Sequence, residues 1–413
     1  ALPAISAASL TNVPAANVVG VHTSLTVTNA TTTGTAVVGG GVTISESGIE
    51  ASGIGITVAS INGGSIGGRR NIVINGAMMV AQRGTSSTTA GYIVDRQNVF
   101  FSGLDEAVTM EQADVASGTS PYAEGFRKSL KITNGNQTSG AGSGDRIQPQ
   151  NKIEAQDIAS SGWKYTDPNS FITLSFWVKS SVAQTFYGYL RSKDGTEQRY
   201  AYSVALSANT WTKVIKTIPG NSNLQFDNDK NEGLQWNILL PFIGTDLTDS
   251  GVSLNSWGAY AGGTRTPDNT STWYTTNNST FELTGVQLEV GSQATFFEHR
   301  TFAEELRGCQ RYLFKNINES GELGCNYGKA FNTTELFSSV RFPVAMRATP
   351  TIIAYSNSGT AGQVHKLGSP DTAYTSIDRL DVYGGMRING SNGTWGTGDT
   401  DMYSFTFQAD AEL

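Results

Sequence analysis

Hydrophobic and polar residues alternate over short stretches along most of this chain, which is the pattern of strands that have one face in a core. The stretch 171–181, FITLSFWVKSS, is the clearest case. Ile172, Leu174, Phe176 and Val178 fall on one face, and the residues between them fall on the other. Because side chains alternate sides along a strand, this spacing predicts a strand with a buried apolar face.

Other stretches repeat this pattern and are separated by turn-forming residues. TWTKVIKTIPG (210–220) and EGLQWNILLPF (232–242) predict further strands, and LRSKDGTEQRY (190–200) predicts a hairpin around an Asp-Gly turn. In FELTGVQLEV (281–290) the apolar residues change parity at Gly285, which is what a β-bulge requires. Short strands between such turns predict a central antiparallel sandwich.

One stretch changes from strand-like alternation to helical spacing. Thr301 is followed three residues later by Glu304, which is the signature of a capping box. The apolar residues that follow at spacings of four, three and four are Phe302, Leu306, Cys309 and Leu313. We therefore expect one short connecting helix over 301–315. A helix of about 14 residues is marginal alone, so it should pack against the seam between two β domains or against a neighbouring subunit.

Residues 1–68 have a different composition from the remainder of the chain. They contain no Lys, no Arg and no aromatic residue, and short alternating runs such as TAVVGGGVTISES (35–47) recur between glycines. A single copy lacks the large side chains that a core needs, so it is either disordered or wound together with identical chains. The many Thr and Val residues favour strands over coil and hence the second alternative, an extended fibrous stalk.

The last hundred residues again predict strands. The end of the chain, MYSFTFQADAEL, places six residues on one apolar face: Tyr403, Phe405, Phe407, Ala409, Ala411 and Leu413. The predicted fold is therefore mostly β. It consists of an N-terminal stalk at 1–68, a sandwich at 69–300, a connecting helix at 301–315 and a smaller C-terminal β domain at 316–413.

Composition and charge exclude several classes of function. The net charge is −7, whereas binding to nucleic-acid phosphates needs clustered Lys and Arg, so no nucleic-acid partner is expected. The chain has no run of 18 apolar residues, so no membrane insertion is expected. The first residues, ALPAISAASL, lack the basic region of a typical signal peptide.

The sequence offers no recognisable catalytic, cofactor or metal site. The three histidines, His22, His299 and His365, are far apart in sequence, and no phosphate-binding loop or dinucleotide motif occurs. We therefore expect no enzyme activity and no cofactor. Cys309 lies on the apolar side of the expected helix and is interpreted as a core residue, and whether it bridges to Cys325 is left open.

Two polar loops carry aromatic pairs that suit sugar binding, because sugar rings have apolar faces and hydroxyls that need polar partners. SGWKYTDPN contains Trp163 and Tyr165, and GGTRTPDNTSTWYTTNN contains Trp273 and Tyr274. These four are the candidate carbohydrate-binding residues. The alternative for each single ring is packing in the core.

RRNIVINGAMMVAQRGTSST is followed by GYIVDRQNVF, and Val286 to Arg300, Glu305 to Tyr312 and the terminal ADAEL carry further motifs. The first motif resembles the opening of a group of bacteriophage tail and virion structural proteins, and the later motifs fit the same group. Gln97 stands where the group usually has Trp. The matching residues of the first motif are Asn71, Ile74, Asn75, Gly76, Gln82, Arg83, Gly84, Thr85, Tyr92, Asp95 and Arg96.

The resemblance implies a virion protein of the tail-fibre kind, with a central region similar to carbohydrate-binding jelly-roll modules. Such proteins commonly form trimers, and the family offers no agreed catalytic residues. The expected partners are two further copies of the chain, other virion proteins through 1–68, and host-surface glycans. The expected location is the virion, assembled in the host cytoplasm.

Two alternatives remain open at this stage. The chain could be a purely structural capsid-attached fibre or baseplate component that binds no receptor. It could also be a polysaccharide depolymerase, which would need a pair of carboxylates in a groove. The sequence leaves open the position on the particle, the glycan and the host.

Overall fold

The computed structural model describes residues 69–316, 326–366, 368–398 and 401–413, and three short strands nearer the N-terminus. These strands pair with one another in antiparallel order: β1 (Ala36–Val37), β2 (Val42–Ser45) and β3 (Gly48–Ala51). β1 and β2 fall within the alternating run 35–47, where strands were expected. The predicted winding of residues 1–68 into a shared stalk otherwise lies outside the described residues, as does Cys325.

One sheet of the central region has six strands, all paired antiparallel. The predicted strand β10 (Phe171–Ser180) lies next to one edge of this sheet, and its Ile172, Leu174, Phe176 and Val178 are fully buried as expected. In spatial order its neighbours are β13 (Thr212–Pro219) on one side, and β17 (Thr280–Val290), β8 (Lys128–Thr133), β7 (Thr109–Asp114) and β4 (Ser86–Ser87) on the other.

The second sheet has eight strands and is also antiparallel throughout. The predicted hairpin around Asp194 and Gly195 forms its β11 and β12, and the predicted strand 232–242 forms β14. In spatial order the strands are β16 (Trp257–Ala259), β12 (Gln198–Leu206), β11 (Gln184–Ser192), β14 (Glu232–Leu240), β9 (Arg146–Glu154), β6 (Gln97–Ser102) and β5 (Gly91–Val94), with β15 (Phe242–Ile243) also paired to β9.

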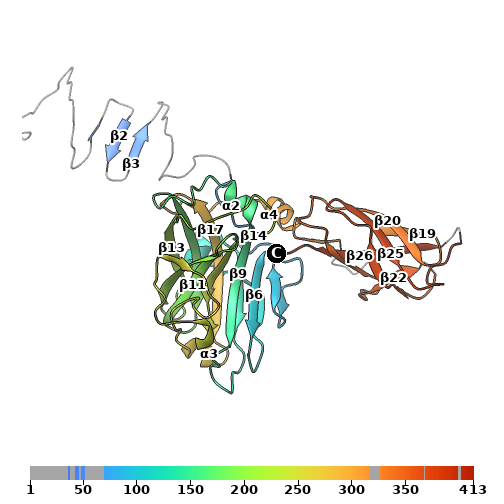
Figure 1. Cartoon of the computed structure of the whole chain (residues 1–413), viewed down its shortest axis with the longest axis horizontal. Coiled ribbons are helices and arrows are strands. Elements are labelled where there is room, and N and C mark those ends of the chain that lie inside the picture. Colours follow the sequence, from blue (N-terminus) through green and yellow to red (C-terminus); the bar gives the residue numbers. More distant parts are fainter. Residues whose placement is uncertain are drawn as a thin grey trace, which may run out of the picture. The chain divides into compact units, whose positions relative to one another are not determined.

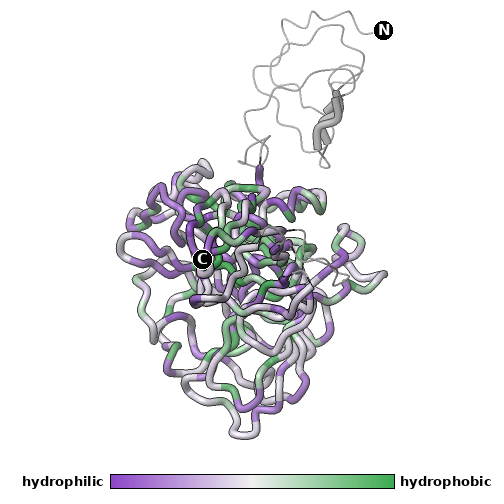
Figure 2. The backbone as a smooth tube through the Cα atoms, turned by 90° about the vertical axis from the view of Figure 1, so that its right-hand side faces the viewer, coloured by the Kyte–Doolittle hydropathy of each residue, from purple (hydrophilic) through white to green (hydrophobic). Residues whose placement is uncertain are grey.

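The two sheets enclose one hydrophobic core, so the central region is a β-sandwich. Its core takes Phe176 and Leu288 from the six-stranded sheet, and Leu190, Trp236 and Ile147 from the eight-stranded one. The chain passes from sheet to sheet between β8, β9, β10 and β11, the kind of crossing connection that a jelly roll requires. Figure 1 shows the labelled strands of both sheets, and Figure 2 shows hydrophobic stretches running through the interior of this body. The prediction of a mostly β, antiparallel sandwich is confirmed.

The predicted bulge is present in β17. Ser175 of β10 pairs with Gln287 and Trp177 pairs with Thr284, so two residues of β17 lie opposite Phe176. One of them, Gly285, has φ of 64°, a left-handed conformation that glycine adopts at little cost. Because of this extra residue, Leu283 and Val286 both face the core although their parities differ.

The C-terminal region forms a third antiparallel sheet with its own core. Its central strand is β26 (Met402–Asp410), and the predicted apolar face is buried at Tyr403, Phe405, Phe407 and Ala409. The order is β23 (Thr372–Ala373), β22 (Gln363–Lys366), β26, β19 (Asn326–Ala330), β20 (Glu335–Arg341), β25 (Gly384–Asn389) and β24 (Ser376–Asp378), with β18 (Leu313–Lys315) and β21 (Thr351–Tyr355) also paired to β26. The domain limits drawn from the sequence stay a prediction.

The expected connecting helix forms, but it is shorter than predicted. α4 spans Phe302–Cys309, and the Thr301–Glu304 capping box is present in both directions. Leu313 lies in β18 instead, beyond the end of the helix. None of the helices in the described part of the chain is both long and apolar enough to cross a membrane. The other helices are single turns: α1 (Ser120–Ala123), α2 (Ala155–Ala159), α3 (Thr272–Thr275) and a 3₁₀ turn (Thr245–Leu247).

The buried face of α4 also differs from the predicted one. Phe302 is 54% exposed, whereas Glu305 is buried beside Cys309. The Glu305 carboxylate accepts a 2.6 Å hydrogen bond from the backbone N–H of Asn75 and lies 3.5 Å from Arg300. A charged residue is buried in place of an apolar one because the helix packs against a turn with backbone donors.

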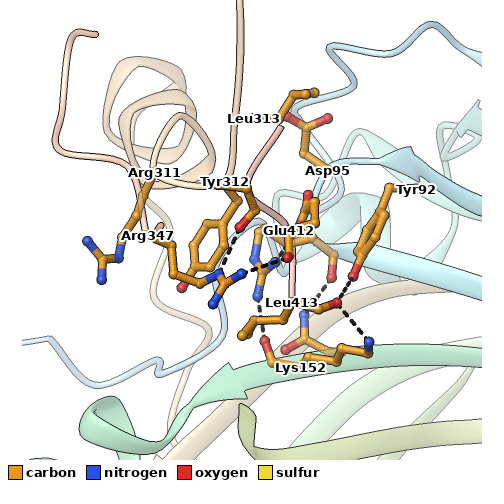
Figure 3. A network of polar contacts seen from close by, with 12 residues as sticks. Tyr92, Asp95, Lys152, Arg311, Tyr312, Leu313, Arg347, Glu412 and Leu413 are labelled. Atoms are coloured by element: carbon orange, nitrogen blue, oxygen red, sulfur yellow. Dashed lines mark hydrogen bonds and ion pairs between the residues drawn. The ribbon is translucent and has the colours of Figure 1, made fainter. Parts of the chain in front are cut away.

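A network of charges joins the sandwich to the end of the C-terminal sheet (Figure 3). The Arg96 guanidinium, 2% exposed, forms an ion pair with Glu412 and lies 3.5 Å from the centre of the Tyr312 ring. Burial by itself would lower the pKa of Arg96, but the Glu412 carboxylate together with Tyr312 and Tyr92 raises that pKa above its usual value. Lys152 and Tyr92 both donate to the backbone oxygen of Leu413, at 2.7 and 3.1 Å.

The same network reaches the end of β9 through Glu154. Arg311 donates to both carboxylate oxygens of Glu154 at 2.7 Å, and the Tyr312 hydroxyl donates to one of them at 2.5 Å. Burial raises the pKa of Glu154, but these hydrogen bonds from Arg311 and Tyr312 lower it further than burial raises it. Glu154 is therefore more acidic in the folded chain than in the unfolded one.

Replacing Glu154 by Gln should destabilise the fold in a pH-dependent way. The native pKa of Glu154 lies below its unfolded value of about 4.3, so its stabilisation is fully present above that pH and is lost as pH falls through the native pKa. We expect a loss of about 3 kcal/mol at pH 7, the lower end for removing one partner of a buried pair. The gap to wild type should close below pH ~4.

The measurement is urea unfolding of both proteins between pH 7 and pH 3. Glu111→Gln is the matched control, because Glu111 forms a half-exposed pair with Lys131 and should cost under about 1 kcal/mol. A gap for Glu154→Gln that stays constant down to pH 3 would show that the carboxylate charge is not what stabilises the fold.

Candidate functional site

The eight-stranded sheet has a polar face opposite its core face, and this face is built by alternation along β9. Ile147 and Ile153 of β9 point into the core. Arg146, Gln148 and Gln150 have the other parity, so they project from the opposite face. Both glutamines are at most 8% exposed, which is unusual for amide side chains on an outer sheet face.

Neighbouring strands continue this polar face in two rows across the sheet. In the first row, the paired residues are Asn98 of β6, Gln150 of β9, Asn237 of β14, Tyr189 of β11 and Ala201 of β12. In the second row they are Lys152, Gln235, Arg191, Arg199 and Gly258. Paired residues on one face of a sheet lie within about 4.5–5.5 Å, so these side chains form one continuous floor.

Aromatic rings and arginines stand around this floor and make it a groove of about 180 Å³. The Arg146 guanidinium lies 4.5 Å from the Phe100 ring centre, and the Arg191 guanidinium lies 3.7 Å from that of Tyr260. Tyr189 and Tyr260 stack at 6.4 Å. The lining residues are Phe100, Arg146, Gln148, Gln150, Tyr189, Arg191, Gln235, Tyr260 and Arg265.

The groove is smaller than the roughly 300–1,000 Å³ typical of pockets that enclose a small molecule. It therefore does not enclose a whole ligand of that kind. β6, β9, β14 and β11, which supply most of the lining, are labelled in Figure 1.

Several buried polar atoms in and under the groove have no hydrogen-bond partner within the described residues. They are Gln148 Nε2, Asn237 Nδ2 and Oδ1, Arg199 Nε and Nη1, and Arg265 Nε. Leaving such a group unpaired costs about 1–3 kcal/mol, so native proteins normally satisfy it with a ligand or ordered water. Other unpartnered atoms lie elsewhere in the described residues, for example in Gln97 and Asn269, but these six lie on one sheet face and make the groove a candidate site for polar partners.

The charges in the groove fall into paired and unpaired groups. Arg191 donates through Nε and Nη2 to Glu197, which also accepts from Lys193 at 2.8 Å. Arg146 donates only to the Ser102 hydroxyl, at 3.1 Å. Burial lowers the pKa of Arg146, and the positive charge of Arg265 lowers it further. The two guanidiniums therefore repel each other across the same groove.

Trp163 and Tyr165, the first predicted carbohydrate-binding pair, lie away from this groove. Trp163 is 3% exposed and belongs to the sandwich core, where its ring contacts those of Tyr165 and Phe226. Tyr165 is half-buried and packs against the same core. Trp163 thus lacks the open ring face that sugar stacking requires, and its ring packs in the core instead.

Trp273 and Tyr274, the second predicted pair, are in α3 and are both buried, at 0% and 1% exposure. The Trp273 indole donates to the Thr280 backbone oxygen at 3.0 Å, and the Tyr274 ring stacks on Phe242 at 4.3 Å. The Tyr274 hydroxyl donates to Asp145 at 2.7 Å. Both rings close one end of the core, so neither presents a face to a ligand.

The groove residues were missed because sequence analysis searched for aromatic residues in loops. The signal was present in RIQPQNKI, where Arg146, Gln148 and Gln150 recur at every second position. A similar signal is present in EGLQWNILL, where Gln235 and Asn237 face the side of the sheet away from Trp236, which lies in the core. Amides at alternate positions of otherwise apolar strands indicate a polar face that is covered, because an ordinary solvent-facing strand would carry Lys, Glu or Thr.

A second cavity, of about 220 Å³, lies near the start of the sandwich beside Arg70, Glu289 and Thr295. Its polar groups largely satisfy one another. Arg70 donates to the Thr295 hydroxyl at 2.7 Å, and Glu289 accepts from the Thr295 backbone and hydroxyl at 2.8 and 2.7 Å. Since these partners are already paired, the cavity has less need of a polar ligand than the groove.

No group of three or more His, Cys, Asp or Glu side chains in the described residues is arranged to hold a metal ion. Cys309 is buried, as expected for a core residue, and burial raises the pKa of its thiol.

Comparison with known proteins gives no family for this chain: no family model and no curated protein matches it. Among solved structures, the enzymatically active domain of tailspike protein 4 from bacteriophage CBA120 matches at 10% identity and a TM-score of 0.28, over 53% of this chain and 21% of that one. A family 16 carbohydrate-binding module matches at 12% identity and 0.22, over 46% and 89%. The tandem CBM22 domain of a Paenibacillus barcinonensis protein matches at 11% and 0.24, over 76% and 93%. At these TM-scores none of the three defines a function for this chain.

Replacing Asn237 by Leu should leave the free protein as stable as wild type or stabilise it by about 1 kcal/mol. Both polar atoms of this buried amide lack partners, so an apolar side chain removes their desolvation cost. The matched control is Asn151→Leu on β9, whose Nδ2 donates to the Arg96 backbone oxygen at 3.1 Å. Losing that bond should cost about 1–2 kcal/mol. Thermal unfolding of both variants is the measurement, and equal destabilisation would mean that Asn237 is satisfied in the free protein.

Proposed function

We propose that this chain is a bacteriophage virion structural protein whose sandwich holds host-surface glycans in the groove of the eight-stranded sheet. The observation that carries the proposal is the combination of buried, unpaired amides and guanidiniums with half-buried aromatic rings on one sheet face. A ligand that satisfies this surface must offer many hydrogen-bonding groups and an apolar face in the same unit.

Saccharides have both properties. Their hydroxyls can accept from and donate to Gln148, Gln150 and Gln235, since an amide presents both a donor and an acceptor. The Tyr260 ring, half-buried and backed by Tyr189, offers an apolar surface for a sugar ring. A floor built from buried amides also discriminates strongly, because an analogue that lacks the matching hydroxyl leaves those amides unpaired.

The virion role is supported by the sequence motifs shared with phage tail and virion proteins and by the composition of residues 1–68. In this proposal the chain assembles as a homotrimer, attaches to other virion proteins through its N-terminal segment and presents the sandwich outward as a tail fibre-like protein. The protein is located in the virion.

Binding without cleavage fits the groove better than hydrolysis does. Glycoside hydrolysis needs two carboxylates about 5–9.5 Å apart. The described residues that line the groove are aromatic, amide and arginine side chains, without an Asp or Glu among them. We therefore propose a glycan-binding protein that is not an enzyme.

Tyr260→Ala and Gln150→Ala should each weaken glycan binding. Loss of the ring or the amide should lower affinity by roughly tenfold, equivalent to about 1.4 kcal/mol, while the fold is retained because both side chains are on the groove face. Binding of the full chain to a glycan array and then calorimetry with the best glycan measure this.

Lys131→Ala is the matched control for these variants, because β8 lies in the other sheet and its pair with Glu111 is half-exposed. It should bind like wild type. Binding that survives both groove variants would move the site elsewhere, and a wild-type chain that binds no glycan would favour a purely structural fibre or baseplate component.

The homotrimer is tested separately by mass. We expect sedimentation equilibrium of the full chain to give three times the 43.9 kDa of one chain, and removal of residues 1–68 to give a monomer with intact groove binding. A full-length monomer would remove the trimer from the proposal without touching the glycan site.

A further inference from the structure

The groove is positively charged although the chain as a whole is negative. The net charge is −7, yet the charged residues that line the groove are Arg146, Arg191 and Arg265. Arg199 lies in the adjoining cross-strand row, as does Lys152, which forms an ion pair with Glu232 at 3.9 Å. A local excess of cations on an acidic protein is a feature of the site that the binding of neutral sugars does not require.

Several partly buried guanidiniums elsewhere in the described residues pair with carboxylates, whereas Arg347 donates to backbone oxygens instead. Arg311 binds both oxygens of Glu154, and Arg387 lies 2.5 Å from Glu335 and 2.6 Å from Asp378. These are the short, charge-assisted contacts that arginine favours.

Arg146 and Arg265 have no such carboxylate partner in the described residues. Arg146 contacts Ser102 and the Phe100 ring, and the buried Nε of Arg265 has no partner. Arg199, 7% exposed, also has Nε and Nη1 unpaired. Since several comparable arginines of this fold pair with carboxylates, an anion is a partner that would suit the guanidiniums of the groove.

The donor and acceptor character of the unpaired atoms supports the same conclusion. The unpartnered atoms that belong to lining residues are Gln148 Nε2 and Arg265 Nε, and both are donors. Donors are therefore in excess in the lining, which favours a ligand rich in acceptors. A carboxylate, sulfate or phosphate oxygen supplies only acceptors, and its charge relieves the repulsion between the two arginines.

We infer that the glycan held in this groove carries an anionic substituent that lies between Arg146 and Arg265. This inference rests on the proposed function and narrows its ligand from glycans in general to acidic ones. The neutral part of the sugar lies over Gln148, Gln150 and Tyr260. A uronic acid, a sulfated sugar and a phosphorylated sugar each carry an anionic group of this kind, so the ligands tested must distinguish among the three.

The experiment measures the full chain on an array that contains neutral, uronate-containing, sulfated and phosphorylated glycans, at about 50 and 300 mM salt. Dextran, carboxymethyl dextran and dextran sulfate of equal length are added as probes that share one backbone. We expect acidic glycans to bind and neutral ones to bind at least tenfold more weakly. We also expect affinity to fall at the higher salt, because salt screens charges in open grooves.

Two double variants with the same change in net charge test the location. Arg146→Gln/Arg265→Gln should lose at least tenfold in affinity for the acidic glycan and most of its salt dependence. Arg307→Gln/Lys164→Gln changes exposed residues outside the groove lining and should bind as wild type does. Binding of only uronates, or of only sulfated or phosphorylated sugars, identifies the anionic group.

Failure of the anionic substituent and failure of glycan binding as a whole would give different results in these experiments. Neutral glycans that bind as tightly as acidic ones, with equal affinity in the Arg146→Gln/Arg265→Gln variant, would overturn the anionic substituent and leave glycan binding in place. Equal losses in both double variants would show a nonspecific charge effect and also overturn it. Absence of binding to any glycan on the array would overturn the proposed function and this inference with it.

Discussion

The buried ion pair between Arg96 and Glu412 is the contact on which the arrangement of the sandwich and the chain end depends. Arg96 sits in the turn between β5 and β6 with φ of 66°, a left-handed conformation that is costly for a side chain of this size. Its charge is compensated by Glu412 and its face is covered by Tyr312. Removing one partner of such a pair leaves a buried charge that costs about 3–5 kcal/mol, so neither end can move independently.

The polar network around Arg96, Glu412 and Glu154, here called the joint, also fixes β9, the strand that supplies much of the groove floor. At the end of β9, Lys152 binds Leu413 and Glu154 binds Arg311. Gln150 and Gln148 precede Lys152 on the same strand by two and four residues. A floor of amides discriminates between ligands only when its strand is fixed to a fraction of an ångström. The charged joint at one end of β9 and the pairing with β14 and β6 along it provide that rigidity.

Sequence patterns predicted the elements whose cause is local. Alternation placed β10 and β26, the parity change placed the bulge at Gly285, and Thr301 with Glu304 placed the start of α4. The end of α4 was not predictable, because Leu313 satisfies helical spacing and strand pairing equally well and tertiary pairing with β26 decided it. Trp163 and Trp273 were misplaced for a related reason, since polar neighbours in sequence do not show whether a ring closes the end of a core. Arg83 and Arg96 belong to the first motif and Glu412 to the terminal ADAEL, but nothing in the local sequence shows that these residues meet in space.

The groove and the joint differ in whether their buried polar groups have hydrogen-bond partners. In the joint, Glu154 receives three charge-assisted or hydroxyl hydrogen bonds and Arg96 has a carboxylate, so burial strengthens each contact. In the groove, Asn237, Arg199 and Gln148 are buried to a similar extent, and polar atoms of each have no partner among the described residues. Burying a polar atom without a partner is costly, so native proteins normally satisfy such atoms with a ligand or with water. The groove is therefore the part of the sheet where the proposed glycan would add polar contacts that the protein itself does not make.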